Sequence, residues 1–367
     1  MQTLNAACNA MATRFEMVLH GENAIGLRAA ADQAVQEIER LHAQLSLYLP
    51  SSEVSYINAR AGRQAVQVEP RLFGLLQLAQ RINHETGGAF DITIAPLVRC
   101  WGFMGGSGAL PTPEQIAEAR ARVGMRHLVL DDKRFTIRFA RPGMMIDLGS
   151  VGKGYALEVA MESLLEAGVQ DALIHGGTST VCAIGAPLEG EAWKVAIDAP
   201  PAGENREEQS GLEEGESESK SKIKSKKYSQ GANAVDNCSA EAPGQAVQSP
   251  DIAEPKRPLA IVELKNEALS VSGVHGKCFR AHGKTYGHVI DPRTGAPAQG
   301  ALLAAVVLPS AAETDAFSTA LLLGGLVGHD QVSRLRENMR TMVVERNYET
   351  GQLVTTGKGM TRLKPPG

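Results

Sequence analysis

The chain has 367 residues, of which 43% are hydrophobic and 21% charged, so it can bury a sizeable core as an ordinary globular protein. A formal net charge of −4 argues against a general nucleic-acid binder, which would carry a basic stripe. The five cysteines include no Cys-x-x-Cys pair and indicate neither a disulfide framework nor a zinc site. No apolar run is long enough to span a bilayer, and the N-terminus shows no leader-like pattern, so we expect a cytoplasmic protein.

Hydrophobic periodicity divides most of the chain into short strands and amphipathic helices. A period of two predicts strands at residues 13–19, 128–130, 135–139, 172–175, 180–183, 193–197, 260–264, 269–272, 286–290, 304–308, 342–345 and 353–355. Helical spacing predicts helices at residues 23–45, with Asn23 as the N-cap, at 72–82, at 151–167 and from about Asp315 onward. This irregular mixture predicts an α+β fold with a mostly antiparallel mixed sheet and flanking helices.

One segment differs in composition from the rest. Residues 200–258 are rich in Glu, Ser, Lys, Gly and Pro, with very few large apolar side chains. Such a stretch buries too little apolar surface to offset the entropy of ordering it. We therefore predict a single domain formed by residues 1–199 and 259–367, interrupted by a low-complexity, disordered insertion at 200–258. A docking arm is the functional alternative to a solvated loop.

Two glycine-rich turns could bring the backbone close to a ligand. In Thr86-Gly-Gly-Ala-Phe-Asp91 the paired glycines permit positive φ, although they could equally end a helix. The run from Asp147 to Gly154 leads into a helix, where N-terminal amides and the charge of Lys153 would favour a phosphate. It is not a Walker A loop, because Gly154 follows the lysine.

Two further groups carry side chains suited to chemistry. His288 precedes an Asp-Pro-Arg-Thr-Gly turn signal, where a structural histidine is the alternative to a catalytic one. Asp315, Ser318 and Thr319 lie three and four residues apart, so they share one face of a helix. Their oxygen atoms suit Mg²⁺, although Thr314 or Asp315 could instead cap a helix that begins near solvent.

In this order, the motifs resemble those of the ApbE family of FAD:protein FMN transferases. The resemblance covers nearly the whole chain outside the low-complexity segment. It is carried by Met11-Ala-Thr13, Leu45-Ser-Leu-Tyr-Leu-Pro50, Gly87-Gly-Ala-Phe-Asp91, Trp101-Gly-Phe103, residues 146–155, His175-Gly-Gly177, Ser272-Gly273, residues 288–295 and residues 315–319.

The resemblance implies an ApbE-like, T-fold-like architecture and a set of site residues. The implied FAD-contacting positions are Met11, Tyr48, Ala89, Phe90, Asp91, Asp147, Lys153 and Ile290. The implied metal positions are Ser150, Asp315, Ser318 and Thr319, and the implied base is His288. In two places the sequence departs from the family pattern. Ala12 stands where the family commonly has glycine, and Ser318 where relatives can carry a carboxylate, so the metal shell has one charge fewer.

The implied reaction is Mg²⁺-dependent transfer of FMN from FAD to a Ser or Thr of an acceptor protein, with release of AMP. The acceptor would carry a motif of the type Asp-x-x-Ser/Thr-Gly-Ala/Ser-Thr, and no nucleic acid takes part. Hydrolysis of FAD to FMN and AMP is an alternative within the family, and a flavin-binding protein without turnover is an alternative of another class. Relatives are often periplasmic or inner-membrane lipoproteins, whereas this sequence as written favours the cytoplasm.

Overall fold

The computed structural model describes residues 1–200, 258–274, 276–347 and 349–360. The predicted insertion at 200–258 lies, apart from its two end residues, outside the described residues, so its disorder stays a prediction. The turn expected around Tyr348 is likewise described only in part. No helix among the described residues is both long and apolar enough to cross a membrane.

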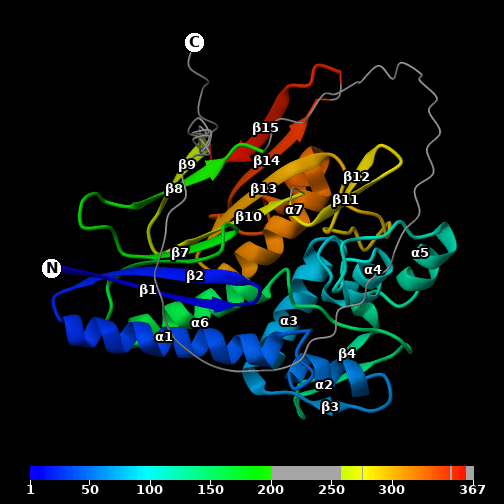
Figure 1. Cartoon of the computed structure of the whole chain (residues 1–367), viewed down its shortest axis with the longest axis horizontal. Helices are drawn as coiled ribbons and strands as arrows, with labels where there is room; N and C mark the ends of the chain where they lie inside the picture. The colour runs from blue at the N-terminus through cyan, green and yellow to red at the C-terminus, as the bar shows by residue number, and fades with distance from the viewer. Residues whose placement is uncertain (201–257, 275, 348, 361–367) are drawn as a thin grey trace, which may run out of the picture. The chain divides into compact units, whose positions relative to one another are not determined.

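An eight-stranded sheet forms the centre of the fold, and every neighbouring pair of its strands is antiparallel (Figure 1). In spatial order the strands are β1 (Gln2–Ala10), β2 (Thr13–Gly21), β6 (Asp171–Gly176), β7 (Thr180–Ile184), β10 (Ala268–Gly273), β13 (Ala301–Leu308), β14 (Arg340–Arg346) and β15 (Leu353–Lys358). The predicted α+β class with a mostly antiparallel sheet is confirmed.

The smaller elements surround this sheet. Three small sheets are formed by β8 (Trp193–Asp198) with β9 (Pro258–Leu264), by β3 (Val66–Gln67) with β5 (Thr136–Phe139) and β4 (Leu128–Asp131), and by β11 (Cys278–Ala281) with β12 (Lys284–Gly287). The helices are α1 (Ala24–Leu45), α2 (Glu53–Arg60), α3 (Pro70–Glu85), α4 (Ala95–Cys100), α5 (Pro113–Arg120), α6 (Gly152–Glu166) and α7 (Ala311–Val332), with short 3₁₀ turns η1 (Ile92–Ile94) and η2 (Met125–His127).

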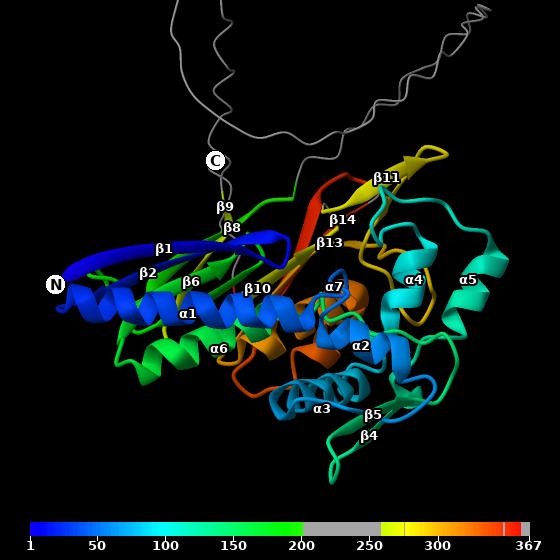
Figure 2. The same cartoon turned by 60° about the horizontal axis from the view of Figure 1, so that its bottom comes forward.

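The two faces of the central sheet are covered differently. Side chains alternate between the faces along each strand, as the pleat requires. Phe15 and Met17 of β2 face the cluster that contains α1, α6 and α7, and these helices lie on one side of the sheet (Figure 2). Val18, on the opposite face of β2, packs with the β8–β9 pair around Trp193. The middle strands of the sheet are therefore covered on both faces, while the edge strands β1 and β15 are largely exposed.

Local signals predicted the first helix well but misplaced the start of the last one. The Asn23 side chain caps α1 by accepting from the N–H groups of Ile25 and Gly26, as predicted. At α7 the cap is Ser310, whose hydroxyl accepts from Glu313 N. Neither Thr314 nor Asp315 caps this helix, because Ser310 provides an earlier start and the following residues continue the helix.

Three other features differ from the sequence-based expectations. The strand expected at 286–290 ends at Gly287, and beyond it Ile290 makes only an isolated bridge to Pro297. Strands β1, β3 and β11 and helices α2, α4 and α5 were not predicted, because each is too short or has too few large apolar residues to show a clear period. Helix α7 is interrupted at Gly325, which has φ 58° and ψ −158°. Only glycine adopts such a conformation readily, so the helix is divided there into two halves.

Candidate active site

A buried carboxylate lies where α6, α7 and β10 meet. Asp315 is only 3% exposed, in the second turn of α7. Its Oδ2 accepts from the backbone N–H of Gly154 at 3.1 Å, and its Oδ1 accepts from the Ser270 hydroxyl at 3.3 Å. Lys153 Nζ lies 3.8 Å from Oδ2. The N-terminus of α6 and the lysine therefore compensate a charge that would be costly to bury alone.

Gly154 allows this contact between the two helices. A Cβ atom at this position would overlap the Ala311 carbonyl oxygen and lie 2.8 Å from Asp315 Cβ. The amides at this end of α6 were expected to favour a phosphate. The N–H of Gly154 instead donates to a carboxylate of the same chain.

A group of hydroxyls extends from Asp315 along the same face of α7. The Ser318 hydroxyl lies 2.8 Å from that of Ser272 and 2.9 Å from the Asp315 carbonyl oxygen. Thr319 Oγ1 lies 3.4 Å from Ser272 Oγ. Ser318 is fully buried, while Thr319 is half-buried. The predicted oxygen-bearing face is thus present, and two serines of β10 complete it.

The donors around Asp315 are oxygen atoms of a kind that Mg²⁺ can accept as ligands. The described residues contain no group of three or more His, Cys, Asp or Glu side chains that could hold a metal ion. Mg²⁺, in contrast, commonly takes one or two carboxylates and completes its shell with water and substrate phosphates. Asp315 with the neighbouring hydroxyls meets that requirement, and Ser150 is half-buried in the turn just before α6.

The turn before α6 brings three of the predicted flavin positions into one region. Asp147 Oδ1 accepts from Gly149 N at 2.8 Å, and Lys153 Nζ donates to the Gly149 carbonyl at 3.2 Å. Burial raises the pKa of Asp147, against the opposing effects of the Gly149 N–H and the Lys153 charge. Tyr48 is 62% exposed, and partial burial together with the Asp147 charge raises the pKa of its hydroxyl. An open, polar surface therefore adjoins the buried Asp315.

His288 lies directly after β12, with one side of its ring against the backbone. The backbone N–H of His288 donates to the Lys277 carbonyl at 2.9 Å, and the ring Nδ1 lies 3.2 Å from the same oxygen. The second contact favours the tautomer with the proton on Nδ1, which leaves the Nε2 lone pair as the basic site. Burial lowers the pKa of His288, and the positive charges of Lys277 and Lys153 act in the same direction, against the Lys277 carbonyl. The ring also meets Phe103 edge-on, with centroids 6.5 Å apart.

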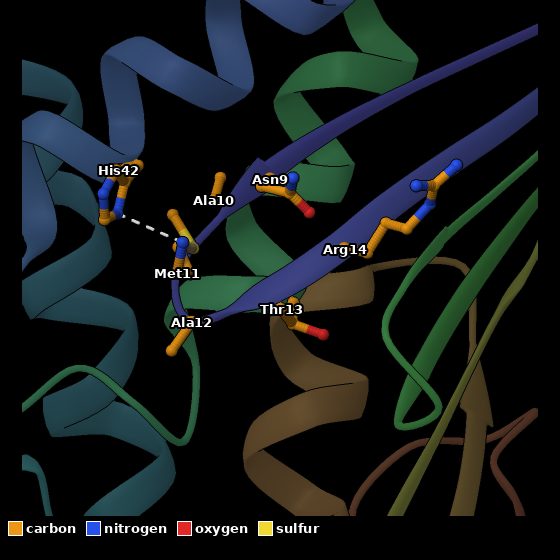
Figure 3. Close-up of a pocket in the computed structure, with 7 residues that line it drawn as sticks. All are labelled: Asn9, Ala10, Met11, Ala12, Thr13, Arg14 and His42. Carbon is orange, nitrogen blue, oxygen red and sulfur yellow. Dashed lines mark hydrogen bonds between the residues drawn. The ribbon is translucent and has the colours of Figure 1, made fainter. Parts of the chain in front are cut away.

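A cavity of about 400 Å³ opens at the turn between β1 and β2 (Figure 3). Met11 and Ala12 form this turn with φ angles of 50° and 58°. The Met11 N–H donates to Nδ1 of His42 on α1 at 3.1 Å, so the helix supports the turn from behind. The cavity is lined by Asn9, Ala10, Met11, Ala12, Thr13, Arg14 and His42.

Comparison with known proteins assigns the chain to a family. The model of the ApbE family matches residues 11–219 and 244–343. The chain belongs to the ApbE family. A FAD:protein FMN transferase of Haemophilus influenzae is 27% identical over 321 residues, which are 85% of this chain and 77% of that protein. One of Klebsiella pneumoniae is 29% identical over 313 residues, 84% of this chain and 74% of that protein.

Solved ApbE structures share the fold. The flavinyl transferase ApbE of Pseudomonas stutzeri, in its apo form, superposes with a TM-score of 0.74 at 23% identity, covering 98% of this chain and 95% of that one. The ApbE protein of Thermotoga maritima gives the same TM-score and identity, with 96% of each chain covered. The family predicted from the motifs is confirmed by the family-model match, and these structures confirm the fold.

Four of the ApbE positions predicted to contact flavin are buried. Ala89, Phe90 and Ile290 are almost fully buried. Asp91 accepts from Thr93 N at 2.7 Å, from Thr93 Oγ1 at 2.6 Å and from Met125 N at 3.1 Å. These side chains support the fold around the site, and their contact with flavin stays a prediction.

The structure gathers some ApbE site residues directly and leaves others apart. Lys153, Ser318 and Thr319 contact Asp315, whereas no hydrogen bond or ion pair among the described residues joins Met11 or His288 to it. Ser270, Ser272 and His42 were not predicted as site residues, although Ser272-Gly273 is one of the family motifs. Serines at alternate positions of an otherwise apolar strand were a signal for the first two. Nothing local distinguished His42 from other helix residues.

Proposed function

We propose that this protein is a Mg²⁺-dependent FAD:protein FMN transferase that attaches FMN to a Ser or Thr hydroxyl of an acceptor protein and releases AMP. The observation that carries the proposal is the buried Asp315 carboxylate, which lies beside Lys153 and a row of hydroxyls. The curated ApbE relatives, which bear the name FAD:protein FMN transferase, support the same activity.

The reaction is phosphoryl transfer, in which positioning and charge neutralisation do most of the work. Asp315 and Thr319, with Ser150 and Ser318, would hold Mg²⁺, which when bound would neutralise charge on the FAD pyrophosphate. Lys153 adds a second positive charge beside the same carboxylate. It orients the pyrophosphate and stabilises the negative charge that develops on the AMP leaving group.

His288 is proposed to accept the proton of the acceptor hydroxyl. The hydroxyl oxygen attacks the phosphorus of the FMN half, the bond to the AMP phosphate breaks, and the proton moves to Nε2 of His288. The lowered pKa of His288 keeps this nitrogen unprotonated near neutral pH. The product is a phosphoester-linked flavoprotein together with AMP.

The flavin half is proposed to bind between the β1–β2 turn and the turn before α6. Met11 offers its side chain at the open cavity, and Tyr48 and Asp147 border the other turn. Since Ala89, Phe90 and Asp91 are buried, we propose that they shape this pocket and meet the ligand through their backbone. The acceptor is proposed to carry the Asp-x-x-Ser/Thr-Gly-Ala/Ser-Thr type of motif.

The test uses purified protein with FAD, Mg²⁺ and a peptide that carries this acceptor motif. Covalent flavin fluorescence on the peptide, with AMP released in equal amount, is the expected result. Free FMN and AMP without labelled peptide would identify a hydrolase and overturn the transferase assignment. Bound but unreacted FAD would identify a flavin-binding protein. A peptide with Ala in place of the acceptor Ser or Thr is the matched control and should stay unlabelled.

A further inference from the structure

Arg293 joins the turn that follows His288 to α7. Arg293 binds the carboxylate of Asp291 through two nitrogens, with Nε to Oδ1 at 2.9 Å and Nη2 to Oδ2 at 2.7 Å. The same Nη2 also donates to the Leu323 carbonyl of α7 at 3.2 Å. Hydrogen bonds to Asp291 raise the pKa of the guanidinium, against partial burial, so it stays charged.

Leu323 lies just before the interruption in α7. The first half of the helix carries Asp315, Ser318 and Thr319 and ends at Gly325, so its last carbonyls lack partners within the helix. A positive charge is favourable at that end of a helix. The second half starts with Leu326, whose N–H donates to Glu345 Oε1 at 2.7 Å. The positive charge of Arg293 thus lies at the carbonyl end of the first half, and the negative charge of Glu345 at the N–H end of the second half.

The other side of the turn is held as firmly. Arg120 of α5 donates to the Arg293 carbonyl at 2.7 Å, and Trp101 Nε1 donates to the Gly295 carbonyl at 2.8 Å. Gly295 has φ 78°, and a Cβ there would lie 2.6 Å from Arg120 Cδ. The turn is therefore fixed to α5, to the end of α4 and, through Arg293, to α7.

We propose that Arg293 is a positioning residue that holds the turn after His288 against the half of α7 that carries Asp315. This inference rests on the proposed function. It identifies Arg293 as the link between the proposed base, His288, and the metal-binding face that carries Asp315. In the proposed reaction, His288 and the Asp315 face act at the same phosphate of FAD. Their relative position therefore decides how well the acceptor hydroxyl is aligned with the phosphorus atom. A displacement of about 1 Å at a reacting centre can lower a rate by about 100-fold.

The test compares three variants of the full chain in the peptide-transfer assay. Arg293→Gln removes the charge and the fork, and we expect kcat to fall by about 10- to 100-fold with the Kd for FAD within about twofold. Arg293→Lys keeps a charge that can reach the Leu323 carbonyl but cannot make the two-nitrogen contact, so an intermediate loss is expected. The matched control is Glu345→Gln, which alters the other end of the same interruption and should lower the melting temperature without changing kcat.

A second measurement does not depend on turnover. NMR titration of the His288 imidazole should give a pKa below about 6.5 in the unmodified protein, moving toward that value in Arg293→Gln as the turn loosens. An Arg293→Gln protein with unchanged kcat and unchanged His288 pKa would overturn the proposal, as would an equal loss of kcat in Glu345→Gln. If the unmodified protein transfers no flavin, the proposed function fails. The positioning role would then be decided by the titration alone.

Discussion

The two sides of the candidate site are built in different ways. Around Asp315, a carboxylate, a lysine and several hydroxyls come from three separate elements and are mostly buried. At the β1–β2 turn, the residues that line the open cavity are neighbours in the sequence, except for His42 of α1. The first side depends on tertiary packing and should respond to single substitutions strongly. The second depends on local backbone conformation and should respond weakly.

The largest effect is expected from Asp315→Asn, which removes the carboxylate of the proposed metal-binding face. It should abolish Mg²⁺-dependent turnover, because a metal ion stabilises charge in phosphoryl transfer by several kcal/mol. Asp315 is buried, so Asp315→Ala should also lower stability by about 1–3 kcal/mol by leaving its donors unpaired. Transfer rates measured against Mg²⁺ concentration, with melting curves, check both expectations.

Asp330→Asn is the control on the same helix, since Asp330 is 79% exposed in its side chain. Unchanged Mg²⁺ dependence in Asp315→Asn would remove the metal assignment.

His288→Asn should lower the transfer rate by about 10²–10⁴-fold while leaving FAD binding nearly normal. In the unmodified protein the rate should rise with pH through a pKa below about 6.5, because burial favours the neutral imidazole and the base works only when neutral. A pH–rate profile at saturating FAD and a flavin titration measure the two quantities.

His282→Asn, in the exposed β11–β12 turn, should behave as the unmodified protein. A structural His288 would instead be revealed by equal losses of stability and FAD affinity, with the pH profile of the remaining activity unaltered.

Gly154→Ala should separate α6 from α7 at the point where they meet. Overpacking of this kind typically costs about 1–3 kcal/mol, because the added methyl meets backbone rather than a movable side chain. Melting temperature and transfer rate should fall together. Gly74→Ala in α3 is the matched control, since open space surrounds that glycine and alanine is the better helix former by up to about 1 kcal/mol. Equal melting temperatures for the two variants would contradict the close contact.

The smallest effect is expected at the β1–β2 turn. Ala12 has φ 58°, a left-handed conformation that costs an L-residue about 1–2 kcal/mol. Glycine removes this strain, but its more flexible unfolded chain offsets part of the gain in stability. Ala12→Gly should therefore raise stability by up to about 1 kcal/mol, as measured by urea unfolding. Ala10→Gly, in the adjoining strand, should lower it. A destabilised Ala12→Gly protein would show that the alanine methyl makes contacts that outweigh the strain.

The sequence by itself determined the elements whose signals are local. The spacing of apolar residues and the Asn23 cap define α1, and alternation defines β2, because these patterns depend on neighbours only a few residues apart. The order of the motifs also identified the family and most of the residues around Asp315. Tertiary structure decided what those residues contact. The burial of Asp315, the hydroxyls of Ser270 and Ser272 beside it, and the close crossing at Gly154 all join residues far apart in the chain. The contact between Arg293 and Leu323 at the interruption in α7 is of the same kind. The partners of a side chain across the fold depend on how whole elements pack, and the spacing of residues in the sequence does not reveal them.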